Sequence, residues 1–148
     1  MTFTFNTANS AGNAVFDQLN ALMTLVNSGS LVIYDNTGTW GGDPDVTPDG
    51  AVLATFTFSA TAFTQAAATG TFPNKTKVAT ASFSASTVAA GASGTAARVA
   101  LKRSAGNGST VIAAGTVGTS GADINFNSVA FSSGANITIS SFTLSLPE

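Results

Sequence analysis

A helical period of three to four residues runs through the first part of the chain. Between residues 9 and 27, apolar side chains recur at every third or fourth position: Ala11, Val15, Leu19, Leu22 and Val26. This spacing places them on one face of an α-helix. Asn9 or Ser10 would cap its start, and Ser28-Gly29 would end it. The pattern therefore predicts one amphipathic helix over residues 9–27 that covers a sheet.

Beyond residue 29 the period changes to two, which is the period of β-strands. We expect a central strand at 31–34, further strands at 51–58, 77–83 and 122–127, and a hairpin over 95–114 that turns at Asn107-Gly108. In the segment 51–58, the pattern places Val52, Ala54, Phe56 and Phe58 on one face and Leu53 on the other.

The last predicted strand covers residues 136–146 and contains an irregularity. Its inward set begins with Ile137 and Ile139 and then changes parity, continuing at Phe142, Leu144 and Leu146. One inserted residue near Ser140-Ser141 would cause this change, so the pattern predicts a β-bulge there.

These segments alternate with turns rich in glycine, serine and asparagine, and no internal repeat or linker divides the chain. The sequence therefore predicts one mainly β domain over residues 1–148. We expect an antiparallel β-sandwich or barrel-like domain with one N-terminal amphipathic helix at about 9–27, followed by β-rich residues 31–146.

The composition and charge of the chain argue against several classes of function. Only 8% of the 148 residues are charged and the net charge is −2, so we expect no nucleic-acid partner. The chain has no Cys and no His, which removes common metal ligands and the usual general base. Neither a secretory leader nor an apolar stretch of membrane-spanning length is visible. We expect a non-enzymatic protein with no cofactor, no metal and no membrane association.

Three groups of residues are candidates for binding. The acidic loop, residues 35–49, holds Asp35, Asp43, Asp45 and Asp49, a pattern of hydrated turns and, as an alternative, of calcium ligands. Trp40 lies among glycines of this loop, where it would anchor an interface, stack on a sugar or fold back over a sheet edge. Arg98 and Lys102 would share the outer face of one strand, with Arg103 beside its turn; a solvated face is the alternative to a docking patch.

The order of several segments resembles a family of small virion structural proteins of tailed bacteriophages that decorate or cement the capsid. The resemblance rests on NAVFDQL (13–19), LVIYDNTG (31–38), GAVLATFTFSATAF (50–63), TAARV (95–99), GADINFN (121–127) and ITISSFTL (137–144). It implies a non-enzymatic assembly protein of the virion, assembled in the host cytoplasm. It brings no catalytic residue to this chain.

From this resemblance we expect a capsid decoration or cement protein that binds the major capsid protein as a homo-oligomer, a trimer or a dimer. Trp40 would supply the apolar anchor, and Arg98, Lys102 and Arg103 the basic surface that meets an acidic shell. A tail or fibre component is the nearest alternative. A carbohydrate-binding β-sandwich module is the alternative from a different class.

Overall fold

The computed structural model describes residues 23–43, 46–65, 76–108 and 110–147. These residues form strands and one short 3₁₀ helix, in this order: β1 (Ser30–Asp35), β2 (Val52–Gln65), β3 (Thr76–Phe83), β4 (Thr87–Ala89), β5 (Gly94–Lys102), η1 (Ala105–Asn107), β6 (Val111–Gly118), β7 (Ile124–Asn125), β8 (Ala130–Phe131), β9 (Asn136–Thr138) and β10 (Thr143–Pro147). The expectation of a mainly β protein is confirmed.

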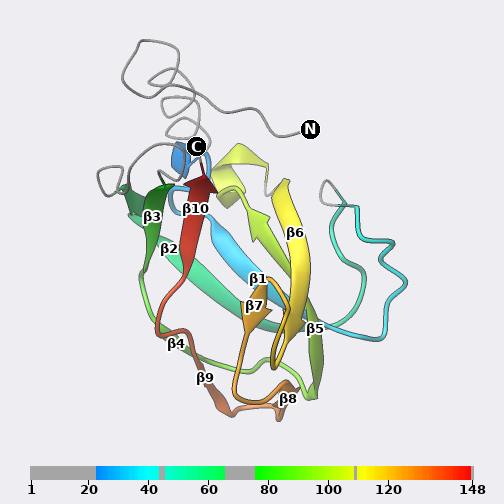
Figure 1. Cartoon of the computed structure of the whole chain (residues 1–148). Helices are drawn as coiled ribbons and strands as arrows, with labels where there is room; N and C mark the ends of the chain where they lie inside the picture. The colour runs from blue at the N-terminus through cyan, green and yellow to red at the C-terminus, as the bar shows by residue number, and fades with distance from the viewer. Residues whose placement is uncertain (1–22, 44–45, 66–75, 109, 148) are drawn as a thin grey trace, which may run out of the picture.

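The strands build one sheet that curls into a half-barrel (Figure 1). Its order is β10-β3-β2-β1-β5-β6-β7, with β8 pairing with β5 off this path and β4 and β9 forming a separate two-stranded ribbon. The strand pairs are antiparallel except for β6 and β7, which run parallel. The two ends of the curl are therefore β10 on one side and β6 with β7 on the other.

The predicted N-terminal helix is not supported by the described part of the chain. Residues 9–22 of that prediction lie outside the described residues. Only Met23 and Thr24 are helical there, and the chain then turns, with the Val26 N–H donating to the Met23 carbonyl at 3.2 Å. The Asn27 side chain instead accepts from the Ala62 N–H of β2 at 2.8 Å. This long-range bond ties the segment to the sheet, and Ser28 adopts a positive φ of 53°.

Strand β1 is central, as its apolar run predicts. It pairs with β2 on one side and with β5 on the other. Leu31 and Ile33 enter the main core, whereas Val32 and Tyr34 belong to a small second cluster with Ala100. All five side chains are buried. Both faces of the sheet are therefore covered at its centre, which explains the continuous apolar sequence.

Strand β2 follows the predicted alternation from Ala54 to Phe58 but departs from it at its start. Ile33 pairs with Ala54, whereas Tyr34 pairs with Val52, so Leu53 is an extra residue in the ladder. This irregularity turns Leu53 into the core and leaves Val52 46% exposed. The prediction that placed Val52 on the inner face and Leu53 on the outer face is wrong, because a bulge shifts the parity of every residue before it.

The predicted hairpin and the predicted strand at 77–83 are both confirmed. β5 and β6 pair antiparallel from Arg98–Thr116 to Lys102–Val111, and their connection contains η1. Gly108 has a φ of 85°, the left-handed conformation that Asn-Gly turns favour. β3 pairs with β2, and the Phe58 and Phe83 rings stack at 4.7 Å between centroids.

The prediction of one bulged strand over residues 136–146 is wrong. β9 pairs with β4 in the small ribbon, whereas β10 pairs with β3 at the end of the main sheet. The change of parity at Ser140-Ser141 marks the passage between two sheets. Ile137 and Ile139 are buried on one side of this break. Phe142, on the other side, lies 6.0 Å from the Phe63 ring.

Candidate functional site

Asp35 joins the two ends of the acidic loop. It is the last residue of β1 and is only 5% exposed. Its Oδ1 accepts from the Thr37 N–H at 3.1 Å, the Thr37 hydroxyl at 2.7 Å and the Ala51 N–H at 2.9 Å. These bonds, the Thr37 hydroxyl foremost, lower the pKa of Asp35 although desolvation opposes them. The carboxylate therefore acts as a structural acceptor.

Asp49 and Arg98 form a second set of contacts across the loop, which we call the loop clamp. Asp49 Oδ2 accepts from the Thr39 N–H at 2.8 Å and the Thr39 hydroxyl at 2.9 Å. The Arg98 guanidinium donates to the Asp49 carbonyl at 2.8 Å and to the Gly38 carbonyl at 2.5 Å, and it lies 3.4 Å from Asp49 Oδ1. The pKa of Asp49 is lowered, chiefly by the Thr39 N–H.

Glycine at position 38 permits this close arrangement. A Cβ on Gly38 would lie 2.0 Å from the Asp49 carbonyl oxygen. Any larger residue would push the two sides of the loop apart and move the Gly38 carbonyl away from Arg98. The TG pair at 37–38, which reads as ordinary turn sequence, therefore also carries a packing requirement.

Trp40 lies within the clamped loop and is half-buried. Its indole Nε1 donates to the Asp43 carbonyl at 2.9 Å, and the same carbonyl accepts from the Val46 N–H at 3.3 Å. Trp40 follows directly after Thr39, which is bonded to Asp49. The indole is consequently held by its bond to Asp43, and the Trp40 backbone continues directly from the clamped Thr39.

The four residues proposed from sequence for binding have different surroundings in the structure. The Arg98 side chain reaches from β5 to Asp49 of the loop that carries Trp40, and it is only 15% exposed. Lys102 lies four residues further along β5, roughly 13 Å at strand spacing, with its Nζ 5.5 Å from the centroid of the Tyr34 ring. Arg103 follows the strand and bonds to Thr110 through its backbone at 3.0 Å. The structure thus places Arg98 against Gly38 and Asp49 of the loop that carries Trp40, and places Lys102 on the same face of β5, four residues further along.

The metal alternative for the acidic loop gains no geometric support from the described residues. Asp35 and Asp49 direct their oxygens to N–H and hydroxyl donors of the loop itself. In residues 23–43, 46–65, 76–108 and 110–147, no group of three or more His, Cys, Asp or Glu side chains is placed to hold a metal ion. Asp45 lies outside these residues.

Asp123 is an acidic contact that sequence reasoning missed. It lies on the turn after β6, and its Oδ2 accepts from the Thr116 N–H and the Thr116 hydroxyl, both at 2.8 Å. The N–H bond is the main cause of its lowered pKa. Thr116 and Asp123 are seven residues apart, a spacing that matches no turn motif. The contact between them is therefore visible only in the structure, where β6 and β7 pair in parallel.

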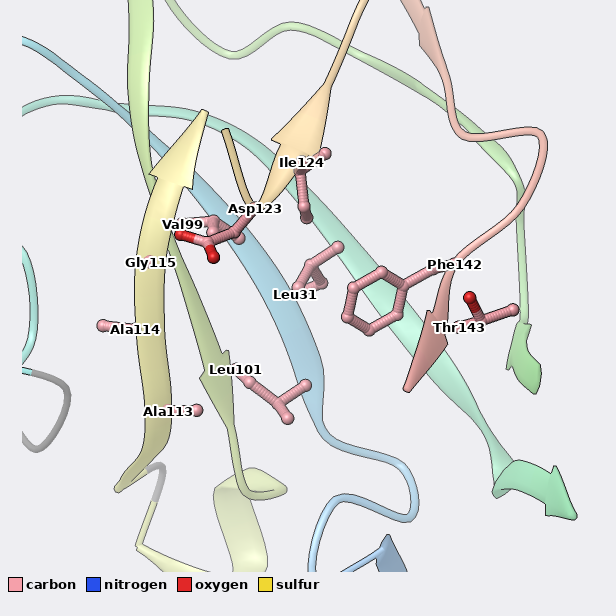
Figure 2. Close-up of a pocket in the computed structure, with 10 residues that line it drawn as sticks. All are labelled: Leu31, Val99, Leu101, Ala113, Ala114, Gly115, Asp123, Ile124, Phe142 and Thr143. Carbon is pink, nitrogen blue, oxygen red and sulfur yellow. The ribbon is translucent and has the colours of Figure 1, made fainter. Parts of the chain in front are cut away.

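A pocket of about 270 Å³ lies beside Asp123 on the concave side of the half-barrel (Figure 2). Figure 2 shows Phe142 directed toward Leu31, with Leu101 and Ile124 nearby and β6 along one side. Among the residues that the structure describes, the lining side chains are apolar except for Asp123 and Thr143. Within the lining that the described residues form, no acid group is paired with a base group.

The comparisons with known proteins add no relative. No family model matches the chain, no curated protein matches it, and no solved structure matches its fold. Among the described residues, no helix has the length and apolar character that a membrane crossing requires.

Proposed function

We propose that this chain is a non-enzymatic structural protein of a bacteriophage virion, a capsid decoration or cement protein that binds the major capsid protein and stabilises the head. The resemblance of six segments between residues 13 and 144 to such proteins carries this proposal. In this account the chain acts as a dimer or trimer on the capsid surface after assembly in the host cytoplasm.

The clamped loop supports a docking role for Trp40. An interface anchor works best when its conformation is fixed before binding, because less entropy is then lost on association. The loop clamp and the bond from Trp40 to Asp43 provide that order. Each contact can be modest in energy, because a shell offers many identical sites and repeated contacts raise the overall affinity.

The geometry changes the role that we assign to Arg98. Its guanidinium bonds to two carbonyls of the loop, so it positions Trp40 instead of meeting the shell directly. Lys102 and Arg103 remain the basic residues proposed for contact with an acidic shell surface. Charges at the rim of an interface affect association rate and salt dependence more than affinity.

Co-sedimentation with expanded heads that lack accessory proteins tests the proposal. We expect the wild type to bind, Trp40→Ala to bind at least tenfold more weakly, and Arg98→Ala to weaken binding by loosening the loop. Lys102→Ala with Arg103→Ala should mainly increase the sensitivity to salt. Thr87→Ala is a control, because its hydroxyl contacts Thr138 in the separate ribbon.

Two outcomes would contradict this function. Absence of wild-type binding to heads, with binding to purified tails or fibres, would favour the alternative of a tail component. Quenching of Trp40 fluorescence by oligosaccharides without binding to heads would favour the carbohydrate-binding alternative. Unchanged binding by Trp40→Ala would keep the decoration role but remove this loop from the interface.

A further inference from the structure

Strand β6 presents a sheet edge over most of its length. On one side it pairs with β5 from Val111 to Thr116. On the other side, β7 reaches only Val117 and Gly118. Within the part of the chain that the structure describes, no strand pairs with this second side over residues 111–116.

The backbone groups on this edge are directed away from β5. The Thr116 N–H leaves the ladder and donates to Asp123 at 2.8 Å. Backbone groups alternate in direction along an antiparallel strand, so the N–H and C=O of Ala114, two residues earlier, point to the same side. Asp123 therefore caps one position of the edge, and no strand of the described residues lies beside the next outward position.

The edge also lacks the features that usually protect edge strands. Exposed edges typically carry charged side chains or proline, which oppose pairing with another chain. The sequence of β6, VIAAGTVG, contains neither. Ala113 is exposed although it pairs with Leu101 on the concave face, so no described residue covers its side chain there.

The pocket of Figure 2 lies directly against this edge. Ala113, Ala114 and Gly115 of β6 line one side of it. Phe142 and Thr143, at the start of β10, line the other. A strand added to β6 would alternate its side chains between the two faces, so every second one would enter this apolar space.

We propose that the β6 edge and its pocket bind an extended segment of a partner protein as an additional strand. Strand addition combines main-chain bonds with pockets for alternate side chains. The segment carries large apolar side chains at alternate positions. Among the described residues, Asp123 is the one charged residue of the pocket lining, and its carboxylate lies against Gly115. The segment is therefore neutral or basic beside its apolar residues.

Labelled peptides and fluorescence anisotropy test this proposal on the full chain, independently of any binding to heads. We expect saturable binding of acetyl-Lys-Thr-Phe-Thr-Phe-Thr-amide. Replacing its Lys by Asp should weaken binding several-fold, and replacing both Phe by Ser should abolish it. Absence of binding by the first peptide, or equal binding by all three, would overturn the proposal.

A matched pair of variants identifies the edge. Ala114→Pro removes the outward N–H without touching the ladder with β5, which edge positions tolerate, whereas Ala114→Thr keeps the N–H. We expect at least tenfold weaker peptide binding by Ala114→Pro than by Ala114→Thr. Equal binding would contradict the proposal.

NMR chemical shifts of the wild-type amide and methyl groups test the proposal without relying on the folding of a variant. Peptide addition should move the Ala114 amide and the methyl signals of Leu101 and Ile124. Shifts confined to other parts of the chain would overturn the proposal. A second copy of this chain is the other possible occupant of the edge, and sedimentation tests for it. Self-association of the wild type that Ala114→Pro abolishes, together with no peptide binding, would assign the edge to a second copy.

Discussion

Two Asp–Thr contacts in this protein have nearly the same local geometry and different surroundings. In the acidic loop, Asp49 Oδ2 accepts from the N–H and hydroxyl of Thr39 at 2.8 and 2.9 Å. After β6, Asp123 Oδ2 accepts from the N–H and hydroxyl of Thr116 at 2.8 Å each. The first contact is reinforced by Arg98, which comes from a distant strand, whereas the second is reinforced only locally, by the Asp123 N–H donating to the Thr116 hydroxyl at 3.3 Å, among the residues that the structure describes.

This difference teaches what fixes a loop in a chain with few charges. One carboxylate can satisfy one N–H and one hydroxyl, which defines a turn but leaves its surroundings free. A loop is held as a unit only when a further group, here Arg98 from a strand 60 residues away, bonds to both of its sides. The clamped loop suits an interface anchor, and the singly capped edge suits a surface that accepts a new strand.

Asp35→Ala should have the largest effect on stability among the polar contacts. It leaves the Thr37 and Ala51 N–H groups without their acceptor at a buried position. We expect Tm to fall on the order of 5 °C or more. Asp35→Asn is the control, because its amide oxygen still accepts hydrogen bonds. Its Tm should fall clearly less than that of Asp35→Ala. Thermal unfolding followed by circular dichroism measures both, and equal losses would argue against the role of Oδ1.

Arg98→Ala should come next. The substitution removes charge-assisted bonds to the Gly38 and Asp49 carbonyls, for which we expect Tm to fall by about 3–6 °C. Lys102→Ala is the matched control on the same strand face, because the Lys102 ammonium lies over the Tyr34 ring and not against the loop. A larger loss in Lys102→Ala than in Arg98→Ala would contradict the loop clamp.

Asp49→Ala and Asp123→Ala compare the two Asp–Thr contacts directly. Both variants lose the same bonds to threonine, but Asp49→Ala also loses the ion pair with Arg98. We expect Tm to fall in both by roughly 2–4 °C, with the larger loss in Asp49→Ala. Differential scanning calorimetry at pH 7 resolves this difference, and the reverse order would show that the additional contact with Arg98 is not stabilising.

The pH dependence of stability should be the smallest effect. Asp35, Asp49 and Asp123 all have a pKa below the ordinary value of 3.8 when folded. A lowered pKa in the folded state gives stability that is complete above the unfolded-state value and is lost as the pH falls through the folded pKa. We expect unfolding midpoints in urea to be flat between pH 5 and 7 and to decrease below about pH 4. The double variant Asp49→Asn with Asp123→Asn should reduce that decrease; an unchanged profile would assign it to other groups.

The sequence predicts the elements of this fold better than their pairing. Alternation identified β1, most of β2 and the hairpin of β5 and β6, because each pattern is local. It misplaced Leu53, and it merged β9 with β10, because a bulge and a passage between sheets both appear as a change of parity. The helix prediction failed after Thr24, because the chain turns there and Asn27, Ser28 and Gly29 bond to β2.

The candidate site was predictable in its residues but not in its connections. Trp40 and the acidic residues stand out as rare side chains in a sequence of small polar ones. The contact of Arg98 with Gly38 spans 60 positions and depends on the register in which Tyr34 pairs with Arg98. Nothing in the sequence near either residue encodes that register, so Arg98 looked like a free surface charge.

The central claim is that Arg98 fixes the loop that carries Trp40, and the fluorescence of this single tryptophan tests it most directly. Acrylamide quenching and steady-state anisotropy should be measured for the wild type, Arg98→Ala and Lys102→Ala at a temperature where all three are folded. We expect Arg98→Ala to increase the quenching constant about twofold and to lower the anisotropy, because both sides of the loop lose a shared donor. Lys102→Ala should match the wild type. Identical quenching and anisotropy in Arg98→Ala and the wild type would contradict the claim.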